Sequence, residues 1–300
     1  MRRQTDGRML TLRAPAKLNL TLEVLGRRGD GYHGVRSVMV PLELADELTI
    51  EPSAQFSFVC DRSELAGERN LAMAALRALG DLPPIRLELR KRIPIQAGLG
   101  GGSSDAAAVL LAAMSGTFGA QPRRDWLRIA RALGSDVPFF LAQTAALVEG
   151  TGERVTPAGA LPHWHALIVK PQAAISTSTA YEELDRAERP QRPRNRSVSI
   201  AMLEALQRAE FSRVTSLLQN DFHELIVSQT PSVAGAKAAL EAAGATNVLL
   251  AGSGSCLFTI ALQRETVEAV GERLDLPRGC ESFVTAFART PQWRPSTEPG

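Results

Sequence analysis

A glycine-rich segment holds the residue types that most clearly suggest chemistry. It reads Gly-Leu-Gly-Gly-Gly from Gly98 to Gly102, followed by Ser103, Ser104 and an alanine-rich stretch. Glycine allows positive φ and close approach to the backbone, and serine can cap a helix. Because a helix N-terminus carries about half a positive charge, the segment predicts a phosphate-binding loop. It matches neither the Walker A pattern nor G-x-G-x-x-G, and a flexible turn packed against a helix is the alternative.

A second run of small residues, from Gly252 to Ser255, lies between two predicted strands. Clustered backbone N–H groups in such a loop can bind an anion, although a tight hairpin explains the same residues. Its use in a binding site therefore requires that it meet the first glycine loop.

Lys17 and Asp136 are the candidates for charge and acid–base chemistry. Lys17 lies in an alternating apolar segment, and Asn19 leaves the same face of the predicted strand. An ammonium there needs an anion or water on its face, or is simply exposed to solvent. Asp136 precedes Val-Pro-Phe-Phe, where a helix cap or turn is the alternative to a catalytic role. The chain has 30 arginines and four lysines, which are Lys17, Lys91, Lys170 and Lys237. Each lysine is therefore a candidate for a position that requires a compact ammonium.

The chain has two tyrosines, Tyr32 and Tyr181, and His33 follows the first of them after a glycine-rich turn. Two tyrosines can stack on both faces of a flat base, and a histidine can hydrogen-bond to the edge of a heterocycle. Packing in the protein interior is the alternative for these aromatic residues.

The elements that must position these residues follow from the apolar periodicity. Strands are predicted at 10–25, 35–44, 85–89, 165–169, 247–250, 256–262 and 282–288, and helices at 70–79, 104–114, 123–133, 199–207, 211–218, 231–243 and 265–274. Turn-forming residues at 156–162 predict a boundary between a first domain, 10–158, and a second, 159–290, before a disordered tail at 291–300. The basic, proline-broken stretch 186–196 is predicted to be a solvated loop. The order of elements in the second half predicts an α+β fold with an antiparallel sheet.

Composition excludes several classes of protein. Three hundred residues that are 44% hydrophobic can bury a sizeable core. The longest apolar run, Ala106 to Met114, is nine residues, short of the ~18 that a membrane helix needs. A polar N-terminus without a secretory signal pattern leads us to expect a cytoplasmic protein without a membrane partner. A net charge of +2 argues against a nucleic-acid partner, and three scattered cysteines argue against thiolate metal sites.

Five motifs together resemble the GHMP kinase superfamily. They are Pro-Ala-Lys-Leu-Asn-Leu at 15–20, Arg-Gly-Asp-Gly-Tyr-His at 28–33, the glycine loop at 98–108, Leu-Gly-Ser-Asp-Val-Pro-Phe-Phe at 133–140 and Ala-Gly-Ser-Gly-Ser at 251–255. They occur in the family's order and span most of the chain. The two glycine loops are typical of the whole superfamily, whereas the motifs at 15–20 and 28–33 point to a member whose substrate carries a cytosine.

The resemblance implies a two-domain α+β fold, with an N-terminal domain like domain 2 of ribosomal protein S5 and a ferredoxin-like C-terminal domain. It implies ATP-dependent phosphorylation, with Mg²⁺, of a hydroxyl on the methylerythritol moiety of a cytidine diphosphate-linked alcohol, a step toward isoprenoid precursors by the non-mevalonate route. The expected assembly is a monomer or a weak homodimer.

The resemblance also implies roles for individual residues. Asp136 is the expected general base, Lys17 its electrostatic partner, and Ser104 the candidate Mg²⁺ ligand. The expected ATP-binding residues are Asn70, Pro94, Ala97, Gly98, Leu99, Gly100, Gly101, Gly102, Ser103 and Ser104. The expected substrate-binding residues are Asn19, Tyr32, His33, Asp136, Thr177, Tyr181, Gly252, Ser253 and Gly254, with the two tyrosines enclosing the cytosine and His33 at its polar edge.

Two alternatives stay open at this point. Another GHMP kinase, of homoserine or mevalonate type, would share both glycine loops without needing a cytosine site. A non-catalytic RNA-binding protein would share the β–α arrangement of ribosomal-protein folds, against which the small net charge argues.

Overall fold

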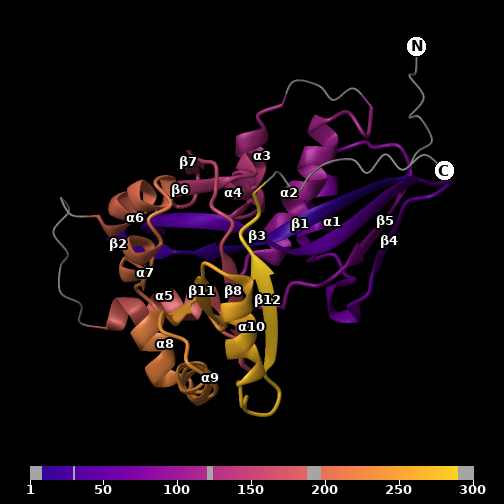
Figure 1. Cartoon of the computed structure of the whole chain (residues 1–300). Helices are drawn as coiled ribbons and strands as arrows, with labels where there is room; N and C mark the ends of the chain where they lie inside the picture. Colours follow the sequence, from indigo (N-terminus) through magenta and orange to yellow (C-terminus); the bar gives the residue numbers. More distant parts are fainter. Residues whose placement is uncertain (1–8, 30, 120–123, 188–196, 290–300) are drawn as a thin grey trace.

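The computed structural model describes residues 9–29, 31–119, 124–187 and 197–289. In Figure 1, the indigo and purple strands of a first sheet lie above most of the orange and yellow elements of the second half of the chain. The predicted tail at 291–300 and most of the predicted basic loop, 188–196, lie outside the described residues.

A mixed sheet built around one long strand forms the first half. Within the described residues its strands are β1 (Leu10–Asn19), β2 (Thr21–Arg27), β3 (His33–Pro52), β4 (Ser57–Cys60), β5 (Ile85–Arg90), β6 (Ala145–Gly150), β7 (Arg154–Gly159) and β9 (Gln219–Asn220). Strand β3 pairs antiparallel with β1, β2, β5 and β6. Strand β9 comes from the second half of the chain and pairs parallel with β2, so both halves contribute to this sheet.

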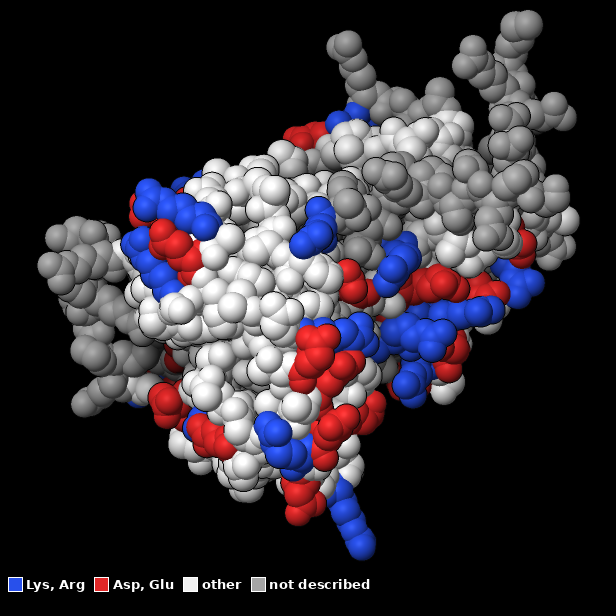
Figure 2. Space-filling model, viewed as in Figure 1, with Lys and Arg blue, Asp and Glu red and all other residues white. Residues whose placement is uncertain are grey.

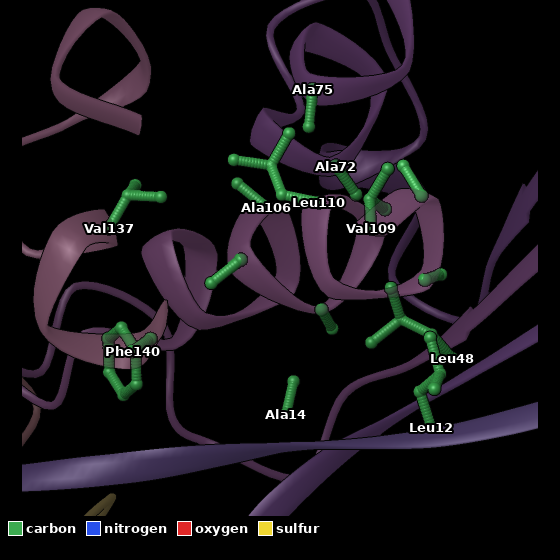
Figure 3. Close-up of a cluster of buried hydrophobic side chains, with 14 of the residues drawn as sticks. Leu12, Ala14, Leu48, Ala72, Ala75, Ala106, Val109, Leu110, Val137 and Phe140 are labelled. Atoms are coloured by element: carbon green, nitrogen blue, oxygen red, sulfur yellow. The ribbon is translucent and has the colours of Figure 1, made fainter. Parts of the chain in front are cut away.

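Helices cover one face of the first sheet. They are α1 (Leu71–Ala78), α2 (Gly101–Met114), α3 (Trp126–Leu133) and α4 (Val137–Ala142), and a 3₁₀ helix, η1 (Ser63–Leu65), precedes α1. Figure 3 shows α2 lying between the strands that carry Leu12 and Leu48 and the helix that carries Ala72. The alanines of α2 allow this close packing because their side chains are small, and ten consecutive residues from Ser104 to Ala113 are buried.

A smaller antiparallel sheet organises the second half. Within the described residues it contains β8 (His165–Lys170), β10 (Leu249–Leu250), β11 (Leu257–Ala261) and β12 (Glu281–Ala286), in the spatial order β10-β11-β8-β12. The helices of this half are α5 (Thr177–Arg186), α6 (Val198–Gln207), α7 (Phe211–Ser216), α8 (His223–Gln229), α9 (Pro231–Ala242) and α10 (Arg264–Glu272). The central strands, β8 and β11, are apolar on both faces, because one face packs on the first sheet and the other on α5 and α8–α10.

A register irregularity in β1 lets this strand contribute side chains to two different hydrophobic clusters. It lies between Pro15 and Lys17 where β1 pairs with β3. Before it, Leu12 and Ala14 pack against the helices, whereas after it Ala16 and Leu18 pack against the second sheet. Irregular pairing of this kind changes the direction of side chains along a strand. Lys17 therefore faces the start of α2 rather than the second sheet.

The α+β prediction is confirmed, and some predicted bounds are wrong. The strand predicted at 10–25 is interrupted at Leu20, where β1 ends and β2 begins. Helix α2 begins at Gly101, three residues before the predicted start at Ser104. Strand β7 includes part of the predicted turn segment at 156–162. The domain boundary at 158/159 stays a prediction.

Charged side chains of both signs are interspersed on the face shown in Figure 2. On strand β5, Arg90 pairs with Glu88 at 3.0 Å and lies 3.9 Å from Glu47 on β3. In the part of the chain that the structure describes, no helix is long and apolar enough to span a bilayer.

The packing between the two sheets leads to a prediction about stability. Phe287 is fully buried, packs near Trp164 and belongs to the cluster that joins the sheets. We expect Phe287→Ala to lower the free energy of unfolding by about 3–5 kcal/mol, because it leaves a cavity in this cluster. Urea unfolding measures the change. The control Val284→Ala, in β12 just before Phe287, changes a residue that is 37% exposed and should cost less than about 1 kcal/mol. Equal losses in the two variants would contradict the prediction.

Candidate active site

The glycine loop leads from β5 into helix α2. Gly100 is the N-cap residue, with a left-handed φ of 74°, and the first helical residue is Gly101. Ser103 and Ser104 were predicted to cap the helix, but they lie within its first turn, and no side chain caps α2. Glycine at 101 and 102 lets this first turn pack closely, because an added Cβ would lie 3.2–3.4 Å from the side chains of Ile93, Asp46 and Leu71. The first N–H groups of α2 therefore stay available to a ligand.

The two predicted glycine loops meet face to face. A Cβ on Gly98 would lie 1.9 Å from the carbonyl oxygen of Ala251, and a Cβ on Gly252 would lie 2.7 Å from the carbonyl oxygen of Gly98. The N–H of Cys256 donates to the carbonyl of Ala97 at 3.3 Å. Only residues without side chains permit this approach, so the second loop is more than a hairpin turn.

Lys17 is held against the glycine loop by its own backbone. Its N–H donates to the carbonyl of Leu99 at 3.0 Å, and its side-chain stem passes 3.2 Å from the Cβ position of Gly100. The ammonium is buried and donates to Asn19 Oδ1 at 2.5 Å, which confirms that the two side chains share a face. The Asn19 amide donates in turn to Ser37.

Asp136 lies beside this ammonium although 119 positions separate the two residues in the sequence. Its Oδ2 is 3.7 Å from Lys17 Nζ, and 27% of its side chain is exposed to the cleft. Burial lowers the pKa of Lys17, and the negative charge of Asp136 opposes that shift. Asp136 occupies the N-cap position of α4 but makes no capping hydrogen bond, so its carboxylate is free of that structural role. Val137 and Phe140, shown in Figure 3, anchor α4 in the core behind it.

The predicted aromatic residues gather at another part of the same cleft. His33 stacks on Tyr181 with ring centroids 4.7 Å apart, and its Nε2 is 2.7 Å from Asp185 Oδ1. Tyr32 is 69% exposed. Burial raises the pKa of Tyr181 to about 12, with added contributions from Asp136 and Asp221. The enclosure of a base between the two tyrosines stays a prediction, since in this structure His33 lies on one face of Tyr181.

One cleft of about 1360 Å³ contains nearly all of the predicted site residues. Its lining includes Lys17, Asn19, Tyr32, His33, Asn70, Pro94, Ala97, Gly98, Leu99, Gly100, Gly101, Gly102, Ser103, Asp136, Thr177, Tyr181, Gly252, Ser253 and Gly254. Asn70 also caps α1, with Oδ1 accepting from the N–H of Ala72 at 2.9 Å. The hydroxyls of Thr177 and Ser253 lie 2.9 Å apart and so connect α5 to the second glycine loop.

Ser104 is the predicted residue that the structure does not bring to the cleft. Its side chain is buried, its Oγ has no hydrogen-bond partner, and it lines a separate small cavity with Gln143, whose Oε1 is also buried and unpartnered. Helix geometry explains this placement, because the early start of α2 at Gly101 turns Ser104 toward the protein interior.

Sequence reasoning missed several polar residues that line the cleft. Lys91 and Asp105 lie beside the glycine loop, and Arg69 and Arg131 come from the segments on either side of it. The scarcity of lysine was a signal for Lys91, and Asp105 directly follows the two serines of the loop motif. Neither signal showed that the two side chains would be in contact.

The arrangement supports transfer of a phosphoryl group. Both glycine loops and the uncapped start of α2 line one space, and a buried ammonium beside a partly exposed carboxylate borders it. The N–H groups and the ammonium suit a polyphosphate, and the carboxylate suits a hydroxyl proton. The fold and this site together define a small-molecule kinase.

Comparison with known proteins identifies the kinase family. The family model for the GHMP kinases N terminal domain matches residues 69–144, and the model for the GHMP kinases C terminal domain matches residues 202–276. The chain is 39% identical over 268 residues to the 4-diphosphocytidyl-2-C-methyl-D-erythritol kinase of Deinococcus radiodurans, covering 87% of each protein. It is 34% identical over 288 residues to the enzyme of that name from Lachnoclostridium phytofermentans, covering 93% of this chain and 97% of the other.

Solved structures agree with these matches. A crystal structure of 4-(cytidine 5'-diphospho)-2C-methyl-D-erythritol kinase has a TM-score of 0.72 and 33% identity, and covers 93% of this chain and all of that one. A homoserine kinase from Cytophaga hutchinsonii has a TM-score of 0.67 at 18% identity, with 97% of this chain and 98% of the other covered, and so shares the fold. The chain belongs to the GHMP kinases and, among them, to the family of the 4-diphosphocytidyl-2-C-methyl-D-erythritol kinases. The predicted two-domain GHMP fold is thereby confirmed.

The contact between the loops leads to a prediction. Gly98→Ala places a methyl group against the backbone of Ala251 at a positive φ. We expect it to lower the free energy of unfolding by about 1–3 kcal/mol, because the two loops must move apart. Thermal or urea unfolding measures the loss. The control Gly67→Ala, where no atom lies within 4 Å of the added Cβ, should change the stability by less than about 0.5 kcal/mol. A Gly98→Ala protein as stable as the control would contradict this account of the loops.

Proposed function

We propose that this kinase transfers the γ-phosphoryl group of ATP to a hydroxyl on the methylerythritol moiety of 4-diphosphocytidyl-2-C-methyl-D-erythritol. The contact between Lys17 and Asp136 at the edge of the glycine loop carries this proposal. The relatives named above act on that substrate by their names, and the first of them matches 87% of this chain at 39% identity. The homoserine and mevalonate kinases found among the solved structures share the fold at 14–18% identity, which does not support their substrates for this chain.

The glycine loop is the proposed site for the ATP phosphates. Gly98–Gly102 and Ser103 line the cleft, and the first turn of α2 leaves its N–H groups without capping side chains. These dipoles favour an anion at the N-terminus of the helix. Phosphoryl transfer requires little covalent chemistry from the protein, so a rigid loop that positions the phosphates supplies much of the catalysis.

Asp136 is the proposed general base. Its carboxylate accepts the proton of the substrate hydroxyl as that oxygen bonds to the γ-phosphorus, and the bond from the γ-phosphorus to the bridging oxygen of ADP breaks. Lys17 lies 3.7 Å from the Asp136 carboxylate and faces the negative charge that develops on the transferred group. Asn19 fixes the ammonium from the other side by accepting a hydrogen bond.

Mg²⁺ is the proposed metal, and the protein contributes few ligands to it. The described residues contain no group of three or more His, Cys, Asp or Glu side chains able to hold an ion. Magnesium that arrives with the nucleotide phosphates needs few protein ligands, because the phosphates bind it and it keeps several of its own water molecules. Ser103 and Asp136 are two of the side-chain oxygen donors that line the cleft near the starts of α2 and α4, whereas Ser104 points into the interior.

The far end of the cleft is the proposed site for the cytidine diphosphate. Tyr32, His33 and Tyr181 supply aromatic surfaces, and Asp185 hydrogen-bonds to His33. The second glycine loop approaches both groups, because a Cβ on Gly252 would lie 3.0 Å from Lys17 Nζ and Ser253 lies 2.9 Å from Thr177, one helical turn before Tyr181 on α5. This position suits the diphosphate.

Replacement of the proposed base tests its role in the chemical step. We expect Asp136→Asn to lower kcat by about 10²–10⁴, because the amide cannot accept the hydroxyl proton, with little change in the KM of the alcohol substrate. Steady-state kinetics with the cytidine-linked substrate measure both constants. Asp81→Asn, an exposed carboxylate outside the cleft, is the matched control. Near wild-type kcat in Asp136→Asn would remove this residue from the role of base.

Removal of the exposed aromatic ring tests the cytidine site. We expect Tyr32→Ala to raise the KM for the cytidine-linked substrate by about tenfold, since stacking on one base contributes ~1–3 kcal/mol, while ATP affinity stays unchanged. Phe56→Ala, which removes another exposed aromatic ring outside the cleft, is the control. Equal weakening of both substrates would show that Tyr32 is structural. Faster phosphorylation of homoserine or mevalonate than of the cytidine-linked alcohol would overturn the proposed substrate.

A further inference from the structure

The second glycine loop is supported by a lysine that the mechanism above does not use. Lys170 is the last residue of β8, and its Nζ donates to the carbonyl oxygens of Pro171, at 2.9 Å, and Ala173, at 2.6 Å. Its third hydrogen bond, at 2.9 Å, goes to Ser255 Oγ at the end of the loop. Ser255 is fully buried, whereas residues 252–254 line the cleft. Lys170 therefore contacts the loop from the protein interior rather than from the cleft.

These contacts join two segments that border the proposed diphosphate site. Ser255 Oγ accepts from Lys170 and donates to the carbonyl oxygen of Ala173 at 2.8 Å. The chain continues from Ala173 into α5, whose first residue, Thr177, hydrogen-bonds to Ser253 at 2.9 Å. The loop and the start of α5 are thus connected twice, once at the cleft surface and once by Lys170 in the interior.

The Lys170 ammonium differs from the other lysine ammonium groups in its partners. Lys17, Lys91 and Lys237 each form an ion pair with a carboxylate. Lys170 forms none within the residues that the structure describes, and its three acceptors are neutral oxygens. Glu281 lies opposite it in the pairing of β8 with β12, but that residue is exposed, so water screens its charge. The positive charge of Lys170 therefore remains available to an anion nearby.

The second glycine loop lies between two ammonium groups. On the cleft side, a Cβ on Gly252 would lie 3.0 Å from Lys17 Nζ. On the interior side, Lys170 Nζ lies 2.9 Å from Ser255 Oγ. Two positive charges on either side of a short loop favour a negatively charged group on its surface. A diphosphate is negatively charged at neutral pH, whereas the nucleoside that carries it is not.

We propose that Lys170 is a positioning residue for the diphosphate of the cytidine-linked substrate: it holds the second glycine loop against the start of α5 and supplies a positive charge behind that loop. This inference rests on the proposed function, because it places the diphosphate on this loop. Lys170 acts through the loop and touches neither the substrate nor the reacting atoms. Its contribution to binding therefore depends on the charge of the ligand and is absent for a cytidine without phosphate.

Binding of cytidine 5'-diphosphate and of cytidine to the full chain, measured by calorimetry, tests the proposal. We expect Lys170→Gln, which keeps a hydrogen-bond donor and removes the charge, to bind cytidine diphosphate about five- to tenfold more weakly and cytidine within about twofold of the wild type. We expect Lys170→Arg, which keeps the charge, to restore the affinity for cytidine diphosphate to within about threefold. In steady-state kinetics, Lys170→Gln should raise the KM of the alcohol substrate and change kcat by less than about twofold.

A matched control and a second charge-free variant complete the test. Lys237→Gln removes the same charge from α9, outside the cleft lining, and should bind both ligands as the wild type does. Lys170→Met, whose unbranched side chain resembles the lysine stem, should reproduce the selective loss seen in Lys170→Gln.

The outcomes separate this inference from the proposed function. Equal weakening of cytidine and cytidine diphosphate in the charge-free variants, or loss of the fold in both of them, would show a purely structural lysine and overturn the inference alone. Unchanged binding of cytidine diphosphate in these variants would overturn it as well. A wild type that binds ATP but not cytidine diphosphate would overturn the proposed substrate and this inference with it.

Discussion

The close approach of two backbone segments is the constraint on which the rest of this structure depends. Gly98 and Gly252 lie face to face, and neither position has room for a Cβ. The first belongs to the loop before α2 and the second to the loop between β10 and β11, so the contact joins the two halves of the chain. The two loops can line a single cleft only because this approach is possible.

Two buried lysines with opposite electrostatic environments border that cleft. Lys17 has one carboxylate at 3.7 Å, and burial lowers its pKa, whereas Lys91 has two carboxylates in direct contact that raise its pKa. With a single carboxylate partner at this distance, the Lys17 ammonium can also interact with an incoming anion. Lys91 is already paired with two carboxyl groups of the protein, so its role is structural although it lies beside the glycine loop.

The orientation of the Lys17 side chain depends on a local irregularity in the pairing of β1 with β3. Leu12, Ala14, Ala16 and Leu18 alternate without interruption in the sequence, yet they enter two different cores. The irregular pairing of β1 with β3 produces this change, and it also leaves the N–H of Lys17 free to donate to the loop carbonyl of Leu99. A regular strand would follow the alternation and keep all of these side chains on one face.

The sequence by itself determined the features that arise from neighbouring residues: the α+β class, the glycine loop before an alanine-rich helix, the shared face of Lys17 and Asn19, and the motif set of the kinase family. Only the tertiary structure decided that α2 begins at Gly101, that Ser104 points into the interior, and that Asp136 reaches Lys17. It alone also paired the ammonium of Lys91 with two carboxyl groups. The physical reason is that periodicity and turn chemistry act over a few residues, whereas side-chain direction at a bulge and the pairing of buried charges depend on contacts between segments far apart in the chain.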